Sequence, residues 1–162
     1  MISLRDSNRI VIAGASSLLG AELKSLLEES RFAASDFTLV DEEVAAGTLT
    51  EAKGEPAIIR PVEEGSFERA GYIFFTGSAA FTSANIAAAR RSGAKIIDLS
   101  GALAREEGTP VWFPALDSLR PALISKQASE FCIPSAAATA AVGLALGPVS
   151  YTHLTLPTIL RV

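Results

Sequence analysis

The sequence has little cysteine and no long apolar run, and each shortage excludes a class of protein. One cysteine among 162 residues rules out an internal disulfide framework and is typical of a reducing compartment. No apolar run approaches the roughly 18 residues of a membrane-spanning helix, and residues 1–8 are too short and polar for a signal peptide. We therefore expect a soluble, cytoplasmic chain with no membrane partner.

Basic and aromatic residues are also scarce. The chain carries 14 Lys and Arg against 18 Asp and Glu, a formal net charge of −4, with no basic block. Aromatic residues make up 7% of the chain, and the many aliphatic residues and alanines are typical of strands covered by helices. The length suits one domain with a substantial core. We expect no nucleic-acid partner and no metal site.

The segment Arg9–Gly20, RIVIAGASSLLG, has the pattern of a strand, a tight loop and the start of a helix. Its β-branched run at residues 10–12 is typical of a strand buried on both faces. The small residues after Gly14 leave main-chain N–H groups at the helix N-terminus to face phosphates, and the helix dipole favours negative charge there. Gly20 would let the helix pack closely on the strand. The residues predicted to line a nucleotide site are Gly14, Ala15, Ser16, Ser17, Leu18, Leu19 and Gly20.

The helix that follows has four leucines at helical spacing, so we expect them to form one face against the sheet. They are Leu19, Leu23, Leu26 and Leu27. A dinucleotide fingerprint carries a glycine where this sequence has Ser17, and a side chain there could crowd the pyrophosphate. A tight strand-to-helix turn without a ligand is the alternative interpretation of the segment.

An acidic residue stands where a dinucleotide-binding domain would hold the adenine ribose. Asp41 follows a second apolar run, Phe37–Val40, about 20 residues beyond Gly20. A carboxylate there accepts hydrogen bonds from the ribose 2′-OH and repels a 2′-phosphate, and Glu42 and Glu43 add negative charge at the same point. The cofactor predicted is therefore NAD, with NADP less favoured.

Further along, strands and helices alternate, which predicts a Rossmann-type α/β fold: a doubly wound, mostly parallel sheet with helices on both faces. Strands are expected at residues 71–76 and 95–99, and alanine-rich helices at 78–92 and 135–146. Residues 48–53 and 57–62 are expected to form a hairpin at the sheet edge. Short extended runs are expected at 110–114 and 129–133, and a helical turn within 63–70.

Four motifs occur in order along the chain: GASSLLG at Gly14–Gly20, TGSAA at Thr76–Ala80, IDLSGA at Ile97–Ala102 and PVWFPALD at Pro110–Asp117. In this order and register they resemble the N-terminal NAD(P)-binding domain of the aspartate-semialdehyde dehydrogenase family, over residues 9–148. N-acetyl-glutamyl-phosphate reductase shares the fold of that family. The resemblance implies an oxidoreductase-like domain of amino-acid biosynthesis. It also implies that Thr76, Gly77 and Ser78 face the cofactor.

In that family a cysteine thiolate at a helix N-terminus attacks the aldehyde carbon, and the helix dipole lowers the pKa of such a thiol. Counting forward from Pro134 puts the family position at Ala136, and counting back from Pro148 puts it at Ala137. Cys132 lies before the proline in a predicted strand, where a small buried hydrophobe is the expected role. The chain thus resembles the non-catalytic paralogues of the family, and no catalytic residue is predicted.

The last segment, residues 149–162, matches neither the family nor a continuing element and resembles a translated sequencing adapter. We expect residues 1–148 to be the nucleotide-binding domain and the tail to be non-native. His153, the single histidine, is therefore not predicted to be catalytic. In the family a second half supplies the catalytic histidine, substrate-binding arginines and most of the dimer interface, and we expect it to be absent here. The resemblance implies a homo-oligomer for the full-length protein.

Three functions remain open from the sequence. The first, which we expect, is a dinucleotide-binding domain without catalysis. The second is an active aldehyde oxidoreductase, of the aspartate-semialdehyde or N-acetyl-glutamyl-phosphate type, that uses Cys132. The third is a non-enzymatic structural partner of an active homologue that no longer binds the nucleotide, and Ser17 and Ala79 in the two loops keep this hypothesis open.

Overall fold

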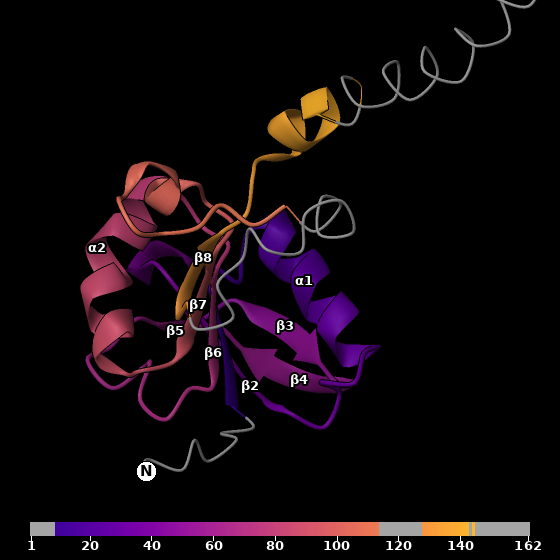
Figure 1. The fold of residues 1–162 in the computed structure, drawn as a ribbon. Coiled ribbons are helices and arrows are strands. Elements are labelled where there is room, and N and C mark those ends of the chain that lie inside the picture. Colours follow the sequence, from indigo (N-terminus) through magenta and orange to yellow (C-terminus); the bar gives the residue numbers. More distant parts are fainter. Residues whose placement is uncertain (1–8, 114–127, 143, 145–162) are drawn as a thin grey trace, which may run out of the picture.

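The structure, a computed structural model, describes residues 9–113, 128–142 and 144. Its main sheet is parallel, and the strand order β5-β2-β1-β6-β7-β8 reverses direction between β1 and β6. The strands are β1 (Arg9–Ala13), β2 (Asp36–Asp41), β5 (Arg60–Pro61), β6 (Tyr72–Phe75), β7 (Lys95–Asp98) and β8 (Glu130–Cys132). Helices α1 (Leu18–Glu28) and α2 (Ala79–Arg91) cover opposite faces of this sheet (Figure 1). The predicted Rossmann-type α/β fold is confirmed.

Strand β1 lies at the centre of the sheet and is buried on both faces. Val11 and Ala13 point into a cluster with α2, whereas Ile10 and Ile12 point into a cluster with α1. All four side chains are at most 1% exposed. The β-branched run at residues 10–12 therefore correctly predicts the strand on which both layers pack.

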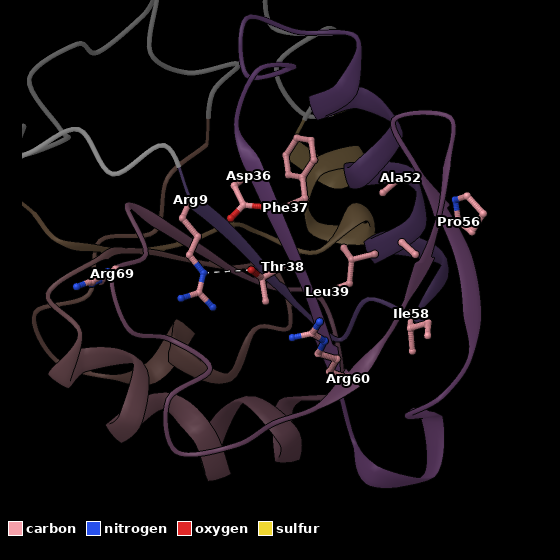
Figure 2. A pocket seen from close by; sticks show the side chains of 11 residues that line it. Arg9, Asp36, Phe37, Thr38, Leu39, Ala52, Pro56, Ile58, Arg60 and Arg69 are labelled. Atoms are coloured by element: carbon pink, nitrogen blue, oxygen red, sulfur yellow. Dashed lines mark hydrogen bonds between the residues drawn. The ribbon is translucent and has the colours of Figure 1, made fainter.

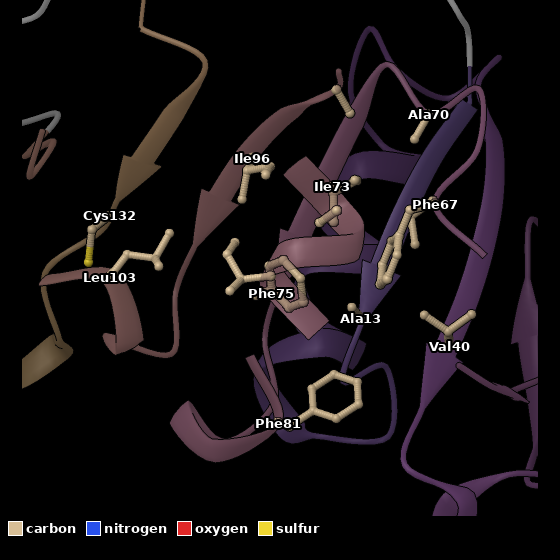
Figure 3. Close-up of a cluster of buried hydrophobic side chains, with 14 residues drawn as sticks. Ala13, Val40, Phe67, Ala70, Ile73, Phe75, Phe81, Ile96, Leu103 and Cys132 are labelled. Atoms are coloured by element: carbon tan, nitrogen blue, oxygen red, sulfur yellow. The ribbon is translucent and has the colours of Figure 1, made fainter. Parts of the chain in front are cut away.

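The larger cluster lies between the sheet and α2 (Figure 3). Phe75 of β6 stands inside it, and its ring centroid lies 6.0 Å from that of Phe67 and 6.5 Å from that of Phe81. Helix α2 matches the helix expected at 78–92, since Ser78 is its N-cap and Ser92 its C-cap. Helix α2 is thus anchored to the sheet by aromatic side chains of the core.

The predicted leucine face of α1 is only half right. Leu23 and Leu27 pack into the smaller cluster, whereas Leu19 and Leu26 are exposed. The stripe that faces the sheet runs through Gly20, Leu23 and Leu27, at i, i+3 and i+7. Leu19 and Leu26 each precede a member of this stripe by one residue and lie about 100° around the helix from it. Leucine spacing alone does not show that a glycine marks the closest approach.

The predicted hairpin forms, but not at the edge of the main sheet, and its second strand, expected at 57–62, begins earlier and ends at Ile58. Strands β3 (Leu49–Ala52) and β4 (Glu55–Ile58) pair antiparallel in a two-stranded sheet of their own. Lys53 and Gly54 turn between them with positive φ angles of 55° and 75°, as a two-residue hairpin favours. The edge of the main sheet is β5, which pairs in parallel with the end of β2. Pro61 fits there because proline is tolerated in edge strands.

Other predicted elements vary in outcome. Residues 63–70 form turns and no helix: their main-chain bonds join residues three apart, and Arg69 has a positive φ of 57° that lies outside the right-handed helical region. In the run at 110–114, the described residues contribute one isolated bridge, between Val111 and Cys132. The run at 129–133 contains β8, and residues 136–142 are helical as predicted. The end of that helix and the tail at 149–162 lie outside the described residues.

Gly20→Ala tests the close approach of α1 to the loop before it. A Cβ there would lie 2.6 Å from the Gly14 oxygen and 2.9 Å from the Thr76 hydroxyl oxygen. Alanine is the better helix former, so a loss of stability can only come from this clash. We expect urea titration to show a loss of about 1–3 kcal/mol in the free energy of unfolding.

Gly65→Ala is the matched control, because its Cβ would meet nothing closer than 3.9 Å. We expect its stability to stay within about 0.5 kcal/mol of the parent chain. Equal stability of the two variants would contradict the packing described for Gly20.

Candidate functional site

Two loops meet at the carboxyl ends of β1 and β6, the neighbouring strands between which the strand order reverses. The first loop, Gly14–Ser17, joins β1 to α1, and the second loop, Thr76–Ser78, joins β6 to α2. Ligands of open parallel sheets bind at this switch point. The loops touch through main chain, because a Cβ on Gly14 would lie 2.1 Å from the Gly77 nitrogen. Gly14 also has a positive φ of 94°, which favours glycine. A side chain at Gly14 would push the loops apart.

Two hydroxyl groups fasten the loops to each other. The Thr76 hydroxyl donates to the Gly14 carbonyl oxygen at 3.0 Å, and the Ser17 hydroxyl donates to the Thr76 carbonyl oxygen at 2.9 Å. Ser17 is also the N-cap of α1, since its Oγ accepts the Gly20 N–H at 2.9 Å. The serine that replaces the fingerprint glycine is therefore bound between the helix start and the second loop.

Helix α1 presents its first main-chain N–H groups beside this junction. The Ser17 N–H donates to the Gly14 carbonyl oxygen at 3.1 Å, and the Gly20 N–H is taken by the cap. Within the described part of the chain, the N–H groups of Leu18 and Leu19 have no protein partner. Both lie at the positive end of the helix dipole, where an anion is stabilised. Two main-chain donors at the start of α1 are therefore unpaired among the described residues.

Asp41 lies at the end of β2 beside the first loop, as its spacing predicts, but its carboxylate binds main chain. Its Oδ2 accepts the Ser16 N–H at 2.7 Å, and its Oδ1 accepts the Glu42 N–H at 2.8 Å. The residue is only 6% exposed. The side chains of Glu42 and Glu43, in contrast, are exposed at the same corner.

The second loop leads from β6 into α2. Ser78 is the N-cap of α2, and its Oγ accepts the Phe81 N–H at 3.0 Å. Its hydroxyl therefore caps this helix, while Thr76 and Gly77 form the junction with the first loop. The structure brings the sequence-predicted residues together at one end of the sheet: Gly14, Ala15, Ser16, Ser17, Leu18, Leu19, Gly20, Asp41, Thr76, Gly77 and Ser78.

Asp98, at the end of β7, is a structural residue that sequence reasoning did not single out. It is fully buried, and its carboxylate accepts the Ser100 N–H at 2.8 Å, the Ser100 hydroxyl at 2.6 Å and the Leu103 N–H at 2.8 Å. These bonds shape the turn into the short 3-10 helix η2 (Ala102–Arg105). The Asp-x-Ser spacing after a strand could have revealed the turn, because Asp side chains commonly bind main chain two residues on.

Cys132 is placed as a core residue. It is 1% exposed and lies opposite Asp98 in the pairing of β7 with β8. Burial raises the pKa of Cys132 to about 11, and the charge of Asp98 and a hydrogen bond to it act in the same direction. Reactive cysteines show the opposite shift. Ala136 and Ala137, at one of which the resemblance places the family cysteine, begin the helical stretch at 136–142 and are both exposed.

A separate open cleft of about 970 Å³ lies beside the first half of β2 (Figure 2). Arg9 is fixed in it, because its guanidinium donates to the Thr38 hydroxyl at 3.1 Å and to the carbonyl oxygens of Ser66 and Glu68. This cleft includes the amino ends of β1 and β2, whereas the two loops lie at the carboxyl ends of β1 and β6. None of the predicted cofactor residues lines it, so it is not part of the candidate site.

The described ranges 9–113, 128–142 and 144 contain neither a membrane-spanning helix nor a metal centre. No helix in these ranges has the length and apolar character needed to cross a membrane. No three His, Cys, Asp or Glu side chains gather in them as a metal centre would require.

The reversed strand order, the glycine contact and the helix N-terminus at the switch point define a dinucleotide-binding domain of the Rossmann class. Residues 9–127 match the family described as semialdehyde dehydrogenase, NAD binding domain. This match covers well over half of the chain, and the protein belongs to that family.

Individual relatives share the same region. A protein named USG-1 protein homolog, from Azotobacter vinelandii, is 29% identical over 150 residues, which are 90% of this chain and 44% of that protein. Aspartate-semialdehyde dehydrogenase of Bacillus subtilis is 26% identical over 108 residues, which are 67% of this chain and 31% of that protein. The chain thus spans less than half the length of these relatives.

Solved structures share the fold. Aspartate semialdehyde dehydrogenase II from Vibrio cholerae, complexed with ASA, superposes with a TM-score of 0.70 over 81% of this chain and 42% of that chain, at 18% identity. A probable aspartate-semialdehyde dehydrogenase from Pseudomonas aeruginosa has a TM-score of 0.64 over 77% of this chain and 36% of that chain, at 25% identity. Aspartate semialdehyde dehydrogenase from Candida albicans, solved with NADP, has a TM-score of 0.58 over 77% of this chain and 42% of that chain, at 16% identity.

Alkylation of Cys132 tests its placement in the core. At pH 8 a thiol with a pKa of about 11 is roughly 0.1% ionised, far less than an unperturbed cysteine. We expect iodoacetamide to modify the native chain at least about 100-fold more slowly than the chain unfolded in guanidinium at the same pH. The native rate should rise as the pH approaches 11. Mass spectrometry of the alkylated fraction measures both rates, and equal rates would contradict the core placement.

Proposed function

We propose that this chain is a non-catalytic domain that binds the pyrophosphate of NAD at the N-terminus of α1. The observation that carries the proposal is the pair of N–H groups on Leu18 and Leu19, which have no partner within the described residues and lie at the positive end of the helix. Gly14 and Gly77, where the loops touch, add no side chain to the crevice.

The residue that departs from the fingerprint is compatible with this role. A structural partner that no longer binds nucleotide would be favoured if Ser17 filled the phosphate position. Its hydroxyl is instead committed to Thr76 and Gly20, which supports binding. The bound cofactor would supply hydride chemistry, and the residues of this chain would only hold and orient it.

The preference for NAD over NADP rests on the corner after β2. Glu42 and Glu43 are exposed there, and their charges would repel a 2′-phosphate on the adenine ribose. The NADP in the Candida albicans structure belongs to that protein and does not decide the preference of this chain.

The lack of catalysis rests on the thiol and on the family position. Cys132 is buried in the core with a raised pKa, so it is not poised as a thiolate nucleophile. Ala136 and Ala137 stand where the resemblance would place the cysteine, and neither has a nucleophilic group. In a longer protein, we propose that a further domain binds the substrate and joins copies of the chain into a homo-oligomer.

Leu18→Pro tests the proposal, because it removes one N–H donor and leaves the helix intact. Leu18 is the first helical residue, where proline is well tolerated, and Ser17 before it has the extended conformation that precedes proline, with φ −67° and ψ 153°. The Leu18 side chain is 87% exposed, so little packing is lost. We expect unchanged stability and, in calorimetric titration, NAD affinity at least about tenfold weaker.

Leu18→Ala is the matched control, since it removes the same side chain and keeps the N–H group. We expect it to bind NAD within about twofold of the parent chain. Equal affinities of the proline and alanine variants would show that this donor does not hold the phosphates. No heat of binding from the parent chain would reject the proposed function as a whole.

A further inference from the structure

Three consecutive N–H groups of the first loop are bound to the end of β2. The Gly14 and Ala15 N–H groups both donate to the Val40 carbonyl oxygen, at 2.9 and 3.2 Å. The Ser16 N–H donates to Asp41 Oδ2 at 2.7 Å, the shortest of the three bonds. The path of the loop from β1 to α1 is therefore set by β2, and the last of these bonds is made by a side chain.

The Asp41 carboxylate has both of its oxygens engaged with main chain. Oδ1 accepts the Glu42 N–H while Oδ2 accepts the Ser16 N–H. Hydrogen bonds to an ionised group are stronger than those between neutral groups. At 6% exposure, little of the residue is left for a ribose hydroxyl to contact.

The hydrogen bond from Ser16 to Asp41 helps to set where the N–H groups proposed to bind phosphate lie. Ser16 directly precedes Ser17, the N-cap of α1, whose hydroxyl joins the helix start to Thr76. The next two residues are Leu18 and Leu19, whose N–H groups have no partner in the described part of the chain. The contacts thus run from the carboxylate, through the loop, to the donors proposed to bind pyrophosphate.

We propose that Asp41 is a positioning residue that fixes the phosphate-binding loop, and that it does not read the adenine ribose. The inference rests on the proposed function, because it concerns how that site is held in its binding geometry. Discrimination between NAD and NADP then comes from the exposed carboxylates of Glu42 and Glu43.

Asp41→Asn tests this role, because an amide has one oxygen for two main-chain donors. Asp36→Asn is the matched control, since it makes the same change at an exposed aspartate at the opposite end of β2, away from the loop. NAD, NADP and inorganic pyrophosphate are each titrated calorimetrically into the parent chain and both variants, after thermal unfolding has shown that the variants are folded.

We expect Asp41→Asn to weaken NAD and pyrophosphate by the same factor, about tenfold. Its ratio of NAD to NADP affinity should stay within about threefold of the parent ratio, and Asp36→Asn should leave the affinities for NAD and pyrophosphate unchanged. Weaker NAD binding with unchanged pyrophosphate binding would show that Asp41 reads the ribose and would overturn the inference.

Hydrogen exchange of the Ser16 amide gives a second test that needs no variant. If Asp41 holds this N–H as a positioning residue, exchange stays slow with and without NAD. Faster exchange on addition of NAD would mean that the carboxylate leaves the loop for the ribose, which overturns the inference. Failure of the parent chain to bind NAD would overturn the proposed function itself, whereas unchanged NAD affinity in Asp41→Asn would overturn only the role of Asp41.

Discussion

The close contact of Gly14 with Gly77 is the constraint on which the rest of the site depends. Two loops can approach this closely only where no side chain intervenes, because a Cβ on Gly14 would lie 2.1 Å from the Gly77 nitrogen. Their approach brings Ser17 within hydrogen-bond distance of Thr76 and holds the start of α1 at the switch point of the sheet. The N–H groups at the start of α1 thereby lie on a junction that is held by main-chain contact and two hydroxyl bonds.

Features of the chain that depend on local pattern could be predicted, and those that depend on packing could not. The run at residues 10–12 correctly predicts β1, since a strand buried on both faces needs no polar alternation. Leu26 was wrongly placed in the core, because the point of closest approach at Gly20 rotates the buried stripe of α1. The position of Asp41 beside the loop was predictable from its spacing, but its bonds to main chain depend on how β2 meets the loop.

The loop junction and the thiol lie in different environments, because the junction is at the carboxyl ends of β1 and β6 and the thiol is in the core. Pairing of β7 with β8 sets Cys132 opposite Asp98, where burial and negative charge raise the pKa of the thiol. A nucleophile would need the opposite environment, at an exposed helix start such as Ala136. Fold and family membership alone cannot decide activity, since function lies in the particular residues of a site.

The most direct test follows main-chain amide signals by NMR while NAD is titrated into the ¹⁵N-labelled chain. We expect the largest shifts at Leu18 and Leu19, whose N–H groups would gain a phosphate partner, with smaller shifts at Gly14 and Gly77. Saturating shifts centred instead on the cleft beside β2, for example at Thr38, would contradict a phosphate site at the start of α1.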